Sequence, residues 1–144
     1  MTIKILLLGS GGREHALATA LEQDPFTEAL YCAPGNPGIA QIAEIFPLDI
    51  SDPIAVLALS QKLSIDLVVI GPELPLIHGV ADALAAAGIA CFGPTRSAAQ
   101  IESSKEFAKE IMAKAGVATA RYLSCIDEAQ VREACSEAQM SCWI

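Results

Sequence analysis

The sequence of 144 residues is poor in basic residues, aromatic residues and histidine. It carries 9 Lys and Arg against 17 Asp and Glu, and the net charge of −8 argues against general affinity for nucleic acid, which needs clustered basic side chains. No apolar run reaches the roughly 18 residues of a membrane span, and the N-terminal segment lacks the basic stretch and cleavage site typical of a secretory signal. We therefore expect no nucleic-acid partner, no membrane partner and a cytoplasmic location.

The cysteines and histidines lack the spacing of a metal or redox motif. The five cysteines form no CxxC pair; they are Cys32, Cys91, Cys125, Cys135 and Cys142. Neither His15 nor His78 has a cysteine at the spacing of a zinc site. We expect reduced, mostly buried thiols and no zinc. His15 is either a hydrogen-bond donor to a ligand or a residue of helix packing.

Hydrophobic residues are abundant, at 53% of the chain with a mean hydropathy of +0.45. Short apolar segments alternate with amphipathic ones, which favours strand–helix–strand units with right-handed crossovers. Strands are predicted at residues 3–8, 29–33, 44–47, 67–70 and 90–92, with a less regular one at 119–123. Helices are predicted at 13–23, 53–62, 79–87, 97–100, 104–115 and 128–137, with a short turn at 38–42. The predicted fold class is α/β, an open and mostly parallel sheet with helices on both faces.

Capping residues support several of these helix ends. Asp52 followed by Pro53 is typical of a helix start. Either Ser103 or Ser104 can cap the helix that follows it. Gly88 is predicted to end a helix in the left-handed conformation that glycine allows.

Four loops rich in Gly and Pro follow predicted strands, at residues 9–13, 34–38, 71–76 and 93–95. Any one of them alone is typical of an ordinary turn. The carboxyl ends of parallel strands meet at one edge of the sheet, where open α/β folds bind ligands. The set of four therefore favours a ligand-binding edge.

The first of these loops partly matches the dinucleotide-binding pattern G-x-G-x-x-G. Gly9 and Gly11 occupy the first two glycine positions, but Glu14 stands at the third, where a carboxylate is expected to lose the close packing of helix on strand. The second strand also ends without the acidic residue that holds a dinucleotide ribose. Both departures disfavour NAD and FAD. What remains is a cradle for a single phosphate, formed by the amides of Gly11, Gly12 and Arg13 and by the helix dipole.

Four longer segments resemble one enzyme family. They read GSGGREHALA, APGNPGIA, VVIGPELPLIHGVADALAAAGIACFGPT and AAQIESSKEFAKEIMAKAGVATA. Over residues 3–125 the chain resembles glycinamide ribonucleotide synthetase, or phosphoribosylamine–glycine ligase, of the ATP-grasp superfamily. The resemblance implies a Rossmann-like pre-ATP-grasp domain. It also implies a reaction dependent on ATP and Mg²⁺ (with Mn²⁺ as an alternative metal) that joins glycine to 5-phosphoribosylamine through glycyl phosphate in de novo purine biosynthesis.

The resemblance also assigns site residues. On the substrate side these are Gly11, Gly12, Arg13, Pro34, Gly35, Asn36, Gly71, Pro72 and Glu73, and for the nucleotide phosphates the residue is Lys105. The Glu73 carboxylate would face ribose hydroxyls or the amine; the less favoured alternative is a loop carboxylate that caps a nearby backbone amide. Lys105 can equally belong to a solvated helix face beside acidic neighbours. No catalytic side chain is assigned, because the chemistry needs positioning and neutralised phosphates more than a protein nucleophile.

We expect residues 1–125 to form the substrate-side domain and residues 126–144 to begin the ATP-grasp region. The glycine-rich ATP lid and the magnesium ligands of the family are absent from this sequence. We therefore expect the chain to be inactive without ATP-grasp and C-terminal domains, and to expose an apolar surface around residues 117–126. The alternative is a non-catalytic Rossmann-like module that binds a nucleotide or a sugar phosphate. A nicotinamide-dependent oxidoreductase is a more distant third.

Overall fold

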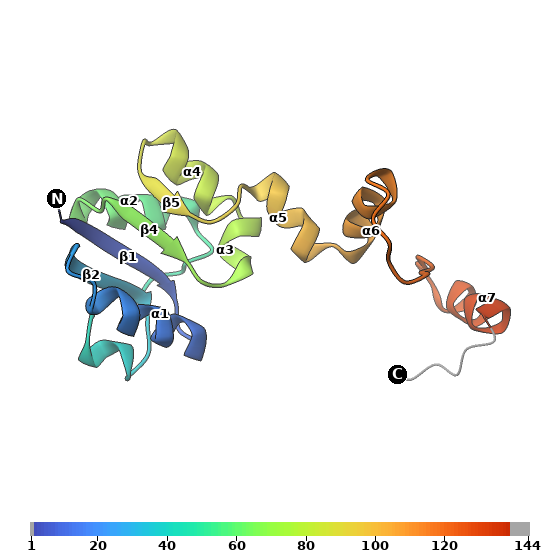
Figure 1. Cartoon of the computed structure of the whole chain (residues 1–144), viewed down its shortest axis with the longest axis horizontal. Coiled ribbons are helices and arrows are strands. Elements are labelled where there is room, and N and C mark those ends of the chain that lie inside the picture. The colour runs from blue at the N-terminus through green and yellow to red at the C-terminus, as the bar shows by residue number, and fades with distance from the viewer. Residues whose placement is uncertain (1, 139–144) are drawn as a thin grey trace. The chain divides into compact units, whose positions relative to one another are not determined.

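A parallel sheet of five strands forms the centre of the N-terminal part of the chain in the computed structural model, which describes residues 2–138 (Figure 1). The strands are β1 Ile3–Gly9, β2 Thr27–Pro34, β3 Glu44–Ile45, β4 Leu67–Ile70 and β5 Ala90–Phe92, in the order β3-β2-β1-β4-β5. The helices are α1 Gly12–Glu22, η1 (a short 3-10 helix) Ile39–Gln41, α2 Pro53–Leu63, α3 Glu73–Ile77, α4 Val80–Ala86, α5 Arg96–Ser103, α6 Lys105–Lys114 and α7 Glu128–Ala138. All four strand pairs are parallel, so the predicted fold class is confirmed.

The chain divides into two compact units, Met1–Ser103 and Ser104–Ile144. The first unit contains the sheet and the helices up to α5, and the second contains α6 and α7. The domain boundary predicted at residue 125 lies within the second unit. It stays a prediction, because compactness within one chain does not define where a family domain ends.

The sheet is buried on both faces, as a parallel sheet requires. Leu6 and Leu8 of β1 pack on one face in a cluster that includes Leu59 of α2. Ile5 and Leu7 pack on the opposite face with Ala18 of α1. Successive residues of a strand point to opposite faces, so this apolar run in β1 supplies both clusters in alternation. Helices therefore cover both faces, as predicted.

The predicted helix ends are largely confirmed. Asp52 Oδ1 accepts hydrogen bonds from the backbone N–H of Ile54 at 2.9 Å and of Ala55 at 3.3 Å. Ser104 caps α6, because its Oγ accepts from the N–H of Phe107 at 3.2 Å. Gly88 follows α4 with a φ of +75°, the left-handed conformation expected after a helix.

The prediction of a loop at residues 71–76 is partly wrong, because α3 begins at Glu73. Pro75 does not prevent this helix, since the first turn of a helix makes no use of backbone N–H groups. The side chains of Pro75 and Leu76 are buried, so the turn is fixed by packing that its Gly-Pro-rich sequence does not reveal. The helix predicted at residues 97–100 also extends further, over Arg96–Ser103.

The strand predicted at residues 119–123 is wrong, because this segment is irregular. Lys109 Nζ donates to Thr119 Oγ1 at 2.5 Å and to the carbonyl oxygen of Ala120 at 3.1 Å, and it lies 5.4 Å from the centre of the Tyr122 ring. A lysine side chain therefore binds the segment to α6 in place of a neighbouring strand. Nearby Leu123 and Ile126 are 62% and 87% exposed, so the expected apolar surface is present; its role in association stays a prediction.

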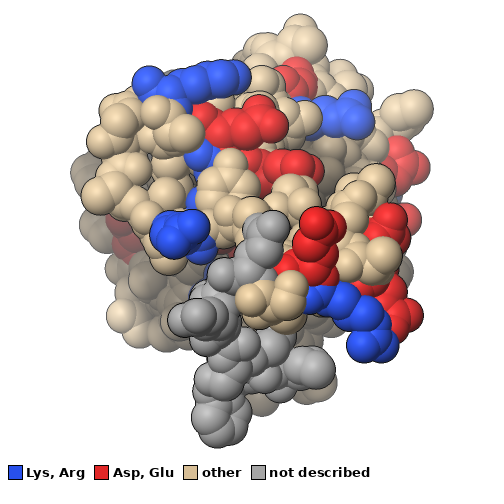
Figure 2. Space-filling view, turned by 90° about the vertical axis from the view of Figure 1, so that its right-hand side faces the viewer, with Lys and Arg blue, Asp and Glu red and all other residues tan. Residues whose placement is uncertain are grey.

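Within residues 2–138, no helix has the length and apolar character needed to cross a membrane. Acidic and basic side chains are interspersed on the face drawn in Figure 2. The expected absence of a nucleic-acid partner stays a prediction.

Candidate functional site

Three of the predicted loops meet at the carboxyl edge of the sheet. The N–H of Gly35 donates to the carbonyl oxygen of Gly9 at 3.1 Å, and Asn36 Nδ2 donates to the carbonyl oxygen of Ser10 at 2.9 Å. The N–H of Gly71 donates to the carbonyl oxygen of Leu8 at 3.0 Å. We name residues 9–13, 34–36 and 71–73 the glycine rim. The sequence predicts this convergence because each loop follows a strand of one parallel sheet.

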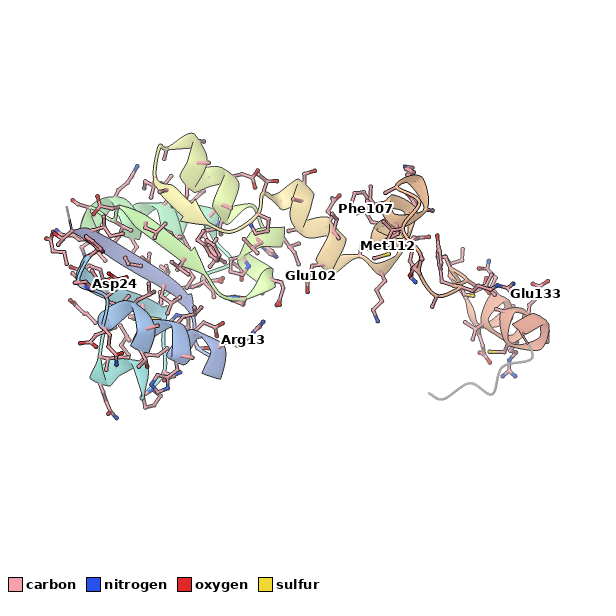
Figure 3. All side chains as sticks on the ribbon, in the orientation of Figure 1. Arg13, Asp24, Glu102, Phe107, Met112 and Glu133 are labelled. Atoms are coloured by element: carbon pink, nitrogen blue, oxygen red, sulfur yellow. The ribbon has the colours of Figure 1, made fainter. Side chains whose placement is uncertain are left out.

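An ion pair joins two loops of the glycine rim. Arg13 Nη2 lies 3.6 Å from Glu73 Oε1, and the two side chains are 73% and 50% exposed. Figure 3 labels Arg13 at the start of α1, where its side chain extends outward. An exposed pair at this distance is weak, so either side chain can turn to a ligand at small cost.

The start of α1 provides amide donors for an anion, but not all of those predicted. Gly11 is the N-cap residue, and its N–H donates to Glu14 Oε2 at 2.7 Å. Gly12 and Arg13 are the first two helical residues, whose N–H groups have no helical carbonyl one turn before them. A Cβ added at Gly12 would have no atom within 4 Å. The open donors therefore lie at Gly12 and Arg13, while the Gly11 amide is already used within the protein.

The loop after β2 is held by its own side chain. Asn36 Oδ1 accepts from the N–H groups of Gly38 and Ile39, each at 2.9 Å, while its Nδ2 binds the first loop. Gly35 has a φ of +72°, and a Cβ there would lie 3.3 Å from Ile45 Cβ. Pro34 is exposed beside them. Asn36 and Gly35 thus shape the glycine rim, and ligand contacts by any of the three stay predictions.

His15 packs against the neighbouring loop. Its ring lies over Gly38, where an added Cβ would be 2.8 Å from His15 Nδ1. His15 therefore packs on the loop after β2, and a hydrogen bond from it to a ligand stays a prediction.

Cys32 lies beneath the glycine rim. The side chain is fully buried, and its thiol donates to the carbonyl oxygen of Gly9 at 3.4 Å. Burial raises the pKa of Cys32 from 9.0 to about 11; hydrogen bonds from the backbone of Ala33 and Gly35 oppose the shift, and the charge of Glu14 adds to it. The thiol is therefore a packed, protonated group and not a nucleophile.

The Cys32 shift makes stability fall at alkaline pH. The thiol of the unfolded chain ionises above pH 9, while the thiol of the folded chain stays protonated up to about pH 11. The contribution of Cys32 to the free energy of unfolding is therefore complete below pH 9 and is lost as the pH rises to 11. Two pKa units correspond to roughly 2–3 kcal/mol. Urea unfolding can be measured below pH 9 and near pH 11. Between these two pH values the free energy of unfolding should fall less for Cys32→Ala than for the wild type. Cys125→Ala is the control, and an equal loss in all three proteins would contradict the assignment.

Lys105, the residue predicted to bind nucleotide phosphates, does not belong to the glycine rim. Lys105 is the first residue of α6, is exposed, and belongs to the second unit. Its predicted contact with nucleotide phosphates stays a prediction. Residues 2–138 contain no group of three or more His, Cys, Asp or Glu side chains that could hold a metal ion.

Sequence reasoning missed the structural part played by Glu14. Glu14 is 4% exposed and packs closely between loops, in contrast to the predicted loss of packing. The spacing of residues in α1 could have indicated that Glu14 is buried. Glu14 precedes the buried Ala18 by four residues and so lies on the same helix face.

Comparisons with known proteins show which family the chain is similar to. The sequence model described as phosphoribosylglycinamide synthetase, N domain, matches residues 3–102. Phosphoribosylamine–glycine ligase of Streptomyces coelicolor is 54% identical over 129 residues, which is 90% of this chain and 31% of the relative. The enzyme of the same name from Mycobacterium tuberculosis H37Rv is 57% identical over 118 residues, or 82% of this chain and 28% of the relative.

Solved structures show the same fold. The phosphoribosylamine–glycine ligase of Thermotoga maritima superposes with a TM-score of 0.70 at 26% identity, covering 94% of this chain and 30% of that one. A biotin carboxylase domain of a bacterial carboxylase superposes with a TM-score of 0.64 at 15% identity, over 94% of this chain and 34% of that one, which indicates a shared fold alone. This chain thus spans about 30% of the length of its relatives. Because the family model matches most of the sequence, the chain belongs to the phosphoribosylglycinamide synthetase family and contains its N domain.

Proposed function

We propose that this chain is the substrate-side part of an ATP-dependent ligase that joins glycine to 5-phosphoribosylamine in purine biosynthesis. In the proposed reaction, ATP phosphorylates the glycine carboxylate to glycyl phosphate and leaves as ADP. The amine of phosphoribosylamine then attacks the acyl carbon and displaces phosphate, giving glycinamide ribonucleotide. The relatives that match the chain bear the name of this ligase. Because the chain spans about 30% of their length, the activity is proposed for a protein that includes the remaining domains.

The observation that carries the proposal is the glycine rim with its open helix start. The amides of Gly12 and Arg13 suit a single phosphoryl group, which the positive end of the helix dipole also attracts. The Arg13 guanidinium can add a charge-assisted hydrogen bond when it leaves Glu73. Glu73 is then free to accept hydrogen bonds from ribose hydroxyls or from the amine. The chain's part in the reaction is to bind and orient the phosphorylated sugar.

ATP and Mg²⁺ are proposed for the whole ligase and not for a site within the glycine rim. We propose that the magnesium ligands belong to the remaining domains of the ligase; residues 2–138 contain no group of three or more His, Cys, Asp or Glu side chains that could hold a metal ion. Lys105 is the residue proposed to approach nucleotide phosphates. We place the ligase in the cytoplasm, in keeping with the free thiols of Cys32, Cys91 and Cys125.

Ribose 5-phosphate is a stable probe for the proposed site. Isothermal calorimetry should show saturable binding of ribose 5-phosphate to the chain and no binding of NAD. NAD binding without ribose 5-phosphate binding would overturn the proposal in favour of a dinucleotide site. Binding of neither ligand would remove the glycine rim as the substrate site.

Arg13→Ala should weaken binding of ribose 5-phosphate by about 1.5–3 kcal/mol, the contribution of a hydrogen bond to a charged group. Arg132→Ala is the matched control, since Arg132 is 77% exposed and pairs with Glu128 as Arg13 pairs with Glu73. The control should leave the affinity unchanged. Equal affinities of Arg13→Ala and wild type by calorimetry would show that Arg13 does not contact the phosphate.

A further inference from the structure

Glu14 is a charged residue in a position that is costly for the fold. It is 4% exposed, and its Oε1 is buried without a hydrogen-bond partner among the described residues. A buried carboxylate oxygen without a partner destabilises the folded state. A residue with such a cost is a candidate for a role beyond packing.

The Glu14 side chain accounts for three of the glycines in the glycine rim. An added Cβ at Gly9 would lie 2.8 Å from Glu14 Cδ, and one at Gly11 would lie 2.7 Å from Glu14 Oε2. An added Cβ at Gly71 would lie 2.5 Å from Glu14 Cγ and 2.7 Å from Cδ. A Cβ at any of these three positions would require Glu14 to shift, and Gly9 also has a φ of +134° that favours glycine. Gly12 differs, because no atom lies within 4 Å of its added Cβ.

Glu14 also connects the two loops that carry the proposed ligand groups. Its Oε2 accepts from the N–H of Gly11, which directly precedes the open amides of Gly12 and Arg13. Its Oε1 lies against Gly71, two residues before Glu73. One buried side chain therefore contacts both the helix start and the turn that leads to Glu73.

We propose that Glu14 is a positioning residue that holds the start of α1 and the Gly71–Glu73 turn at the spacing needed for a phosphorylated sugar. The inference rests on the proposed function, because the site it shapes is the proposed phosphate site. Glu14 does not touch the ligand in this arrangement. It sets where the amides of Gly12 and Arg13 lie relative to the backbone of the turn that carries Glu73.

The test compares Glu14→Ala with a variant that loses buried volume elsewhere. Leu59→Ala is the control, because Leu59 is 9% exposed on α2 and belongs to the core cluster on one face of the sheet. Glu14→Gln is the conservative variant, since its amide oxygen can still accept from the Gly11 N–H. Glu14→Asp keeps the charge but is too short to contact both loops, and it carries the test if Glu14→Ala does not fold. The two measurements are the affinity for ribose 5-phosphate and the hydrogen exchange of the Gly71 amide.

The proposal predicts that Glu14→Ala and Glu14→Asp weaken ribose 5-phosphate binding by at least about tenfold, while Glu14→Gln stays within about threefold of wild type. Leu59→Ala should lose thermal stability but keep its affinity. The Gly71 amide should exchange faster in Glu14→Ala than in Leu59→Ala. Equal affinity and equal exchange in these two variants would overturn the proposal. If the wild type does not bind ribose 5-phosphate, the proposed function fails, and the exchange measurement alone decides whether Glu14 holds the loops.

Discussion

Gly71→Ala is expected to lower the free energy of unfolding by about 1–3 kcal/mol, the range of a core overpacking change. The added Cβ would lie 2.5 Å from Glu14 Cγ, so the buried Glu14 side chain must shift. Moving Glu14 would also break its hydrogen bond with the Gly11 N–H. Urea unfolding of the variant and the wild type under the same conditions measures the loss.

The source of this loss can be tested with a double variant. Gly71→Ala combined with Glu14→Ala should be more stable than the sum of the two single losses, by about 1–2 kcal/mol, because the second change removes the atoms that the first one meets. Additive losses would show that the Cβ at position 71 meets something other than Glu14. A Gly71→Ala variant as stable as the wild type would contradict the described packing altogether.

Gly12→Ala is expected to weaken binding of ribose 5-phosphate by about 10- to 100-fold while the fold stays at least as stable. Gly12 is the first residue of α1 and a Cβ there meets no atom within 4 Å, so the fold tolerates alanine. Replacing a helical glycine with alanine stabilises a protein by about 0.4–1 kcal/mol when the backbone allows it. The same Cβ would stand where a phosphoryl group approaches the amides of Gly12 and Arg13.

Calorimetry and thermal unfolding on one preparation separate these two effects. Because Gly12→Ala keeps its stability, a lost affinity cannot be attributed to unfolding. Gly71→Ala is the opposite case, because it is expected to lower the free energy of unfolding first. An unchanged affinity of Gly12→Ala would show that the ligand does not approach the first turn of α1.

The sheet and most helices are predictable because their residues repeat with the period of the element they form. The apolar run in β1 indicates a strand buried on both faces, and Asp52 with Pro53 marks the start of α2. These signals are local, and the structure follows them. The meeting of the Gly-rich loops is predictable for a related reason, since parallel strands bring their carboxyl ends to one edge.

The features that the sequence does not reveal depend on contacts between distant residues. α3 forms where Gly71, Pro72 and Pro75 are typical of a turn, because burial of Leu76 fixes one helical turn. The segment at 119–123 is not a strand, because the Lys109 side chain binds its Thr119 and Ala120. Glu14 looks like a departure from a glycine pattern, and only the fold shows that Gly71, distant in sequence, provides the space for it.

The central claim is that the glycine rim is one anion-binding site. It is tested most directly by following backbone amide resonances of the whole chain by NMR during titration with ribose 5-phosphate. The account predicts saturable shifts, with one affinity, for the amides of Gly12, Arg13 and Glu73. Saturable shifts confined to the opposite edge of the sheet, around Asp66 before β4, or no shifts at a ligand excess, would contradict it.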